Sequence, residues 1–87
     1  MPEQYVNKID DLCGDGKEFI VTLNDRKKTE AIERALKKCH LKQNLSEILT
    51  KGKYNDKEVS IFKTGKILIR EFSGKEEAKR FLEELFK

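Results

Sequence analysis

The chain has 87 residues, of which 37% are hydrophobic and 40% charged, and its formal net charge is only +3. Disorder requires few hydrophobic residues together with a large net charge, so this composition predicts one folded domain spanning residues 1–87, with a thin core. No apolar run approaches the ~20 residues that cross a bilayer, and no signal-peptide pattern follows the N-terminus, which favours a cytoplasmic location and no membrane partner.

The first segment, Pro2 to Cys13, predicts a short helix. Its apolar residues Tyr5, Ile9 and Leu12 recur at helical spacing, and glycines follow the segment. We therefore expect residues 1–16 to form an N-terminal helical extension, and residues 17–87 to form the body of the domain.

The body begins with a predicted strand and a predicted helix. In the strand, Lys17 to Leu23, apolar Phe19, Val21 and Leu23 alternate with Glu18, Ile20 and Thr22. An amphipathic helix follows, from a cap at Asn24 or Asp25 as far as His40. It has an apolar stripe and several Lys and Arg residues off that stripe.

The next segment, Leu45 to Lys51, suits either a helical turn or a strand, and the context favours a strand. Val59 to Phe62 and Lys66 to Phe72 then predict a hairpin. A three-residue loop with Gly65 in the left-handed conformation segregates the side chains better than a two-residue loop does, and places Phe62 opposite Lys66.

The last helix is predicted to start at Ser73, with Glu76 completing a capping box. The predicted fold class is therefore α+β: a curved antiparallel sheet with two long helices on one face, in the order β-α-β(3-4)-α, after a short N-terminal helix.

The hairpin register determines the two faces of the sheet. Four β-branched residues face the helices, which leaves Phe62, Leu68 and Phe72 on the open face. There Glu58 is expected to pair with Arg70. If Leu45 to Lys51 is a strand, Leu45 and Leu49 join this face and Ile48 turns toward the core. The predicted binding face is Leu45, Leu49, Lys51, Phe62, Lys66, Leu68, Arg70 and Phe72. The alternative is that Tyr5, Ile9 and Leu12 of the N-terminal helix cover it.

Nothing in the chain predicts an active site. The adjacent pair Cys39 and His40 lacks further metal ligands, and Cys13 and Cys39 are too few for a disulfide framework. The acidic stretch around Asp10 and Asp11 lacks the pattern of a calcium loop. We therefore expect a non-enzymatic binding module with no cofactor and no metal. The abundance of Lys, Glu and Ile, with few Gln, is compatible with a thermophilic source.

The stretch Ile61-Phe62-Lys63-Thr64-Gly65-Lys66-Ile67-Leu68, with Ser73-Gly74-Lys75-Glu76-Glu77-Ala78-Lys79 after it, resembles the end of one repeat of the TATA-box-binding protein family. The resemblance covers residues 17–87 in pattern, and only the turn motif is specific. It implies a β-α-β(4)-α repeat whose open sheet face meets the DNA minor groove through apolar wedges. By position, Phe62 matches a wedge phenylalanine, Leu68 a minor-groove contact, and Leu45 the second wedge. Arg70 replaces a small hydroxyl residue, and the base-reading asparagine expected near Gly16 is absent.

Two interpretations of the open face stay open. Phe62 and Phe72 could stack on nucleic acid, with Lys and Arg residues contacting phosphates. Alternatively, the same face could bind a second copy of the chain or another protein, which the small net charge favours. The aromatic side chains and the resemblance favour nucleic acid, and DNA in particular.

Overall fold

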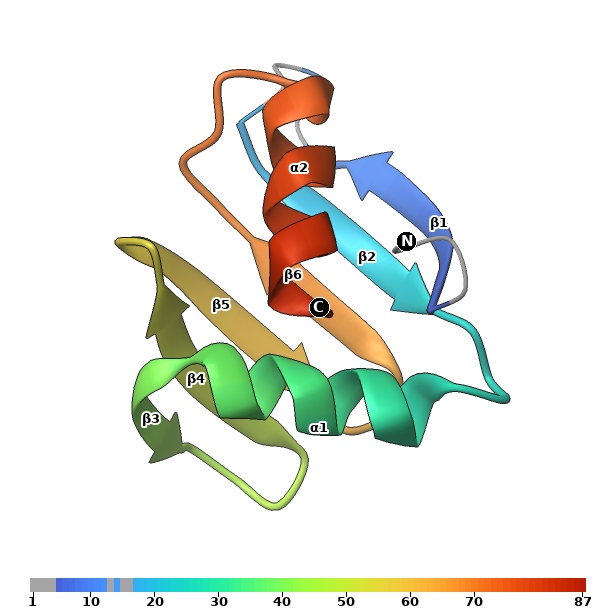
Figure 1. The fold of residues 1–87 in the computed structure, drawn as a ribbon, viewed down its shortest axis with the longest axis vertical. Coiled ribbons are helices and arrows are strands. Elements are labelled where there is room, and N and C mark those ends of the chain that lie inside the picture. Colours follow the sequence, from blue (N-terminus) through green and yellow to red (C-terminus); the bar gives the residue numbers. More distant parts are fainter. Residues whose placement is uncertain (1–4, 13, 15–16) are drawn as a thin grey trace.

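The structure is a computed structural model that describes residues 5–12, 14 and 17–87. The described residues form β1 (Val6–Asp11), β2 (Phe19–Leu23), α1 (Lys28–Lys38), β3 (His40–Asn44), β4 (Leu49–Tyr54), β5 (Lys57–Phe62), β6 (Lys66–Ile69) and α2 (Lys75–Leu85). The strands make one six-stranded antiparallel sheet in the order β1-β2-β6-β5-β4-β3, and both helices lie on the same face of it (Figure 1). The predicted α+β class, with an antiparallel sheet and two helices, is confirmed.

The N-terminal segment is a strand, so the predicted helix is wrong wherever the structure describes it. β1 pairs with β2, with a bulge between Val6 and Lys8. Because of this extra residue, Val6 and Ile9 both face the helices although they are three positions apart. Pro2, Cys13 and Gly16 lie outside the described residues.

Tyr5, directly before β1, packs on the helix side of the sheet and not on the open face. Its ring is buried on the helix side, where its centroid lies 5.6 Å from that of Phe86. The guanidinium of Arg34 lies over the same ring at 5.7 Å. Leu12 is 47% exposed. The alternative in which Tyr5, Ile9 and Leu12 of an N-terminal helix cover the open face is therefore wrong.

The β5–β6 hairpin has the predicted three-residue loop. Phe62 lies opposite Lys66, and the amide of Gly65 donates to the carbonyl of Phe62 at 3.0 Å. Gly65 has a φ of +113°, which a residue with a Cβ rarely adopts. The four residues expected to face the helices are all buried: Val59, Ile61, Ile67 and Ile69.

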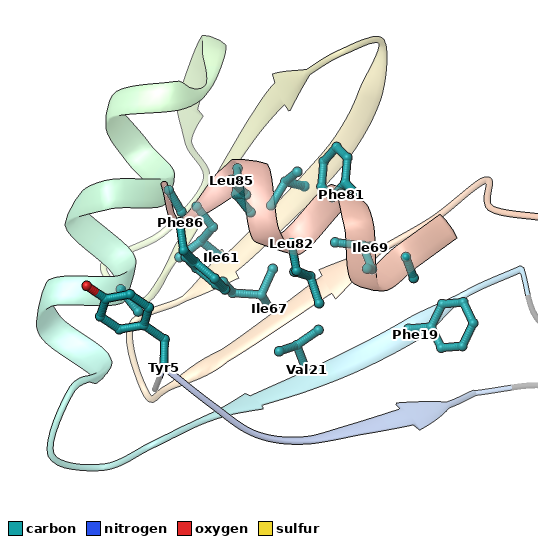
Figure 2. Packing of buried hydrophobic residues seen from close by; sticks show 14 of the residues in the cluster. Tyr5, Phe19, Val21, Ile61, Ile67, Ile69, Phe81, Leu82, Leu85 and Phe86 are labelled. Carbon is teal, nitrogen blue, oxygen red and sulfur yellow. The ribbon is translucent and has the colours of Figure 1, made fainter. Parts of the chain in front are cut away.

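The core lies between this face and the two helices. Phe81, Leu82 and Leu85 of α2 pack toward the central strands (Figure 2). Burying each large apolar side chain contributes about 1.5–3 kcal/mol. Cys39, directly after α1, packs so close to Gly52 of β4 that a side chain at Gly52 would not fit. A Cβ added there would lie 2.7 Å from the Cβ of Cys39.

The segment after α1 differs from its prediction. α1 ends at Lys38, and His40 begins β3, a strand the sequence did not predict. Of the expected strand Leu45 to Lys51, only the part from Leu49 onward is a strand. Ile48 is 53% exposed, so the expectation that it turns into the core is wrong.

The start of α2 also differs. The helix is N-capped by Gly74, with no side-chain cap hydrogen bond, so the predicted capping box of Ser73 and Glu76 is wrong. Glu76 and Glu77 in the first turn still favour the helix start, since carboxylates interact well with the N-terminal end of the helix dipole.

Candidate functional site

The face of the sheet opposite the helices carries three cross-strand rows of side chains, and the row farthest from the β5–β6 turn includes Glu58 and Lys53. The row next to the β5–β6 turn runs Lys8, Thr22, Lys66, Phe62 and Leu49. The middle row runs Asp10, Ile20, Leu68, Ser60, Lys51 and Gln43. Within the described part of the chain, no helix packs on this face. We call it the open face.

Four half-buried apolar residues make a continuous diagonal across the open face, and we call them the apolar stripe: Ile20, Leu68, Phe62 and Leu49. Ile20 lies opposite Leu68, and Leu49 lies opposite Phe62. Ser60, which lies between Leu68 and Lys51 in the middle row, is only 6% exposed. The stripe is a shallow apolar platform four strands wide.

Five of the predicted site residues lie on this face: Leu49, Lys51, Phe62, Lys66 and Leu68. Leu45 lies instead in the turn between β3 and β4, 47% exposed, where its amide donates to the carbonyl of Leu49 at 3.0 Å. Arg70 follows the end of β6. Sequence reasoning did not include Ile20 in the site, because nothing in the sequence indicates that β2 lies beside β6.

The expected position of Phe72 on the open face is wrong. Glu71 has a φ of +67°, which breaks the strand alternation after Arg70 and turns Phe72 to the helix side. There Phe72 is 4% exposed, with its ring centroid 5.2 Å from that of Phe81. The ammonium of Lys57 lies 4.8 Å from the centre of the Phe72 ring and also donates to the carbonyl of Glu71. Phe72 is a core residue.

Several cations of the open face are paired with carboxylates. Lys51 Nζ lies 2.7 Å from Glu58 Oε1, and its hydrogen bond lowers the pKa of Glu58. Arg70 Nε lies 3.9 Å from Glu18 Oε1, so the expected pair of Glu58 with Arg70 is replaced by these two pairs. Arg70 still lies close enough to Glu58 to help lower its pKa.

Lys66, on the other side of the apolar stripe, differs from Lys51 and Arg70 in its charge environment. Lys66 is exposed and lies directly opposite Phe62. Among the described residues, no ion pair within 4.0 Å involves Lys66. An ammonium without a carboxylate partner, next to a half-buried aromatic ring, is well suited to an anionic ligand that carries flat rings.

Side chains that bind metals form no cluster in the described part of the chain. Its residues contain no group of three or more His, Cys, Asp or Glu side chains placed to hold a metal ion. Cys39 is buried, and this burial raises the pKa of its thiol, which disfavours the nucleophilic thiolate. Within the same residues no helix is long and apolar enough to cross a membrane.

Comparison with protein families, with curated proteins and with solved structures finds no match for this chain.

Proposed function

We propose that the chain is a nucleic-acid-binding module that uses the open face of its sheet. The observation that carries the proposal is the environment of Phe62. Its half-buried ring lies between Leu49 and Lys66 on a face that no described helix covers. Aromatic and aliphatic side chains on a sheet stack against bases, while ammonium groups beside them contact phosphates.

The order of the elements supports a relationship to the repeat of the TATA-box-binding protein family. From β2 onward the order is strand, helix, four strands, helix, which is what the sequence resemblance implies. Phe62 and Leu68, which match a wedge and a minor-groove contact of that family, are neighbours in the apolar stripe. On this proposal, residues 17–87 are one such repeat, and β1 extends its sheet.

A second candidate is self-association, in which the apolar stripe packs against a second copy. The neutralised pairs Lys51–Glu58 and Arg70–Glu18 favour it, because they leave part of the open face without net charge. A dimer of this kind depends on protein concentration and changes little with salt. Nucleic-acid binding instead weakens steeply as salt rises.

The test measures binding of a fluorescent mixed-sequence oligonucleotide by anisotropy, at low and moderate salt, with light scattering of the protein alone. We expect salt-sensitive binding that Phe62→Ala weakens by about 1–3 kcal/mol, the usual contribution of stacking one base on an aromatic ring. Leu12→Ala is the matched control, since Leu12 is an exposed apolar residue outside the stripe.

Equal affinity of the Phe62→Ala and Leu12→Ala proteins would contradict the proposal. A salt-insensitive dimer that Phe62→Ala dissociates, with no oligonucleotide bound, would support the second candidate in its place.

A further inference from the structure

Two basic loops meet at one end of the sheet. The amide of Leu23, at the end of β2, donates to the carbonyl of Gly65 at 2.8 Å, which joins the β2–α1 loop to the β5–β6 turn. The side chain of Lys28 lies against the same glycine, with its Cδ 3.3 Å from where a Cβ on Gly65 would be. We call the cations gathered there the cationic end: Arg26, Lys27, Lys28, Lys63 and Lys66.

The charges of the cationic end are largely uncompensated. In the described part of the chain, none of its residues takes part in an ion pair within 4.0 Å. The pKa of the Glu30 carboxyl is lowered mainly by its hydrogen bond with Tyr5 and further by the charge of Lys27, so Lys27 is compensated in part. Asp25 is the acidic residue within the β2–α1 loop. The cationic end therefore keeps a clear excess of positive charge.

The opposite side of the apolar stripe is closer to charge balance. Arg70 is paired there with Glu18, and Lys51 with Glu58. Lys53 lies opposite Glu58 in the sheet. Lys63 and Lys66 thus border the stripe beside Phe62 without an ion pair within 4.0 Å in the described part of the chain, while on the other side Lys51 and Arg70 are paired with carboxylates and Lys53 lies opposite Glu58.

We infer that the ligand of the open face is a single strand, with its phosphates along the cationic end and its bases turned over Phe62 and Leu68. This inference rests on the proposed function. A duplex presents a phosphate backbone on each side of its groove, so a face docked into that groove meets phosphates along both of its flanks. A single strand has one backbone and unpaired bases free to stack. The one-sided charge of this face fits the single strand.

The experiment uses the full chain and anisotropy with two probes: a labelled mixed-sequence DNA single strand, and the blunt duplex made from it. The test protein is the double variant Lys63→Gln with Lys66→Gln. The matched control is Lys37→Gln with Lys79→Gln, which removes the same charge from exposed residues of α1 and α2, on the opposite face. Circular dichroism checks that each variant is folded.

We expect the single strand to bind at least tenfold more tightly than the duplex. The double variant at the cationic end should weaken single-strand binding roughly tenfold or more at low salt. It should also reduce the slope of log affinity against log salt by about 0.7 for each phosphate that the protein no longer neutralises. The control pair should change the affinity less than twofold.

Duplex binding as tight as single-strand binding would overturn the inference, and so would equal reductions in affinity from the two double variants. If Phe62→Ala abolishes binding while the Lys63 and Lys66 variant retains it, the proposed function stands and the inference fails. If the unmodified chain binds neither probe, both fail.

Discussion

The two faces of the sheet are built from the same strands but differ in how far they are buried. On the helix side, Val21, Ile67 and Ile61 form a cross-strand row that is almost wholly excluded from solvent. On the open side, the row through Ile20 and Leu68 is only half-buried. The apolar character of a strand residue therefore does not decide its burial here. The helices do, because they cover one face only.

This difference separates the energetic roles of the faces. The helix face holds the domain together, and in a chain of this size one truncated core side chain removes much of the ~5–15 kcal/mol of total stability. The apolar stripe stays accessible on the other side, so its residues can be changed at small cost to the fold. Binding and folding can then be tested separately.

The largest expected effect on stability comes from truncating a leucine on the helix side of the sheet, compared with the same change on the open face. Leu82→Ala removes a side chain with no solvent exposure and should lower the free energy of unfolding by about 2–5 kcal/mol, since it leaves a cavity. Leu68→Ala, on the half-buried open face, should cost about 1 kcal/mol. Urea denaturation measures both. Equal costs would mean that the open face is covered in solution and would contradict the comparison.

A smaller effect is expected at Glu71, where the chain passes from the open face to the helix face. Its φ of +67° is unfavourable for a residue with a Cβ, so Glu71→Gly should stabilise the domain by about 0.5–1 kcal/mol. The same change at Glu76, inside α2, should destabilise it by about 1 kcal/mol. Loss of stability from both substitutions, again in urea, would show that the backbone at Glu71 is not strained.

The smallest effect concerns the Lys51–Glu58 pair of the open face. The folded-state pKa of Glu58 lies below its ordinary value of 4.5, so the pair adds stability above that pH. This contribution is lost as the pH falls through the lowered pKa. We expect Glu58→Gln to be slightly less stable than the unmodified chain near neutral pH and equally stable in acid.

The measurement is the free energy of unfolding from neutral pH to below about pH 4. Glu83→Gln, at an exposed residue of α2, is the control. If the difference in the free energy of unfolding between Glu58→Gln and the unmodified chain stays the same in acid, the charge pair is not the cause of that difference.

Regular alternation allowed the β5–β6 hairpin to be predicted from the sequence. Its register follows from placing Val59, Ile61, Ile67 and Ile69 on one face, and Gly65 supplies the turn. Five of the eight predicted site residues follow from that register and from the strand that begins at Leu49.

The two missed strands both lack a regular alternation of apolar and polar residues. In β1 the bulge between Val6 and Lys8 puts Val6 and Ile9, three positions apart, on the same face, which imitates helical spacing and hides the period of two. β3, His40–Asn44, is almost wholly polar in sequence and has an irregular register between His40 and Gln43, so no alternation marks it as a strand. The positive φ of Glu71 is a third local irregularity, and it explains the misplacement of Phe72.

The cationic end depends on tertiary contacts between loops distant in the sequence. Arg26 and Lys63 come from separate basic segments, which are brought together by the contacts of Leu23 and Lys28 with Gly65 in the β5–β6 turn. The ion pairs that neutralise Lys51 and Arg70 likewise depend on strand neighbours that sequence reasoning did not establish.

The sheet order has a consequence for how the domain assembles. β6 is the strand that joins β2 to β5, and Phe19 pairs with Ile69, fifty residues further along the chain. While the chain is being synthesised, β1-β2 and β3-β4-β5 are two separate pieces with open edges. They become one sheet only when β6 inserts between them. Such long-range pairing slows folding, and a chain cut before Lys66 would lack the strand that unites its two halves.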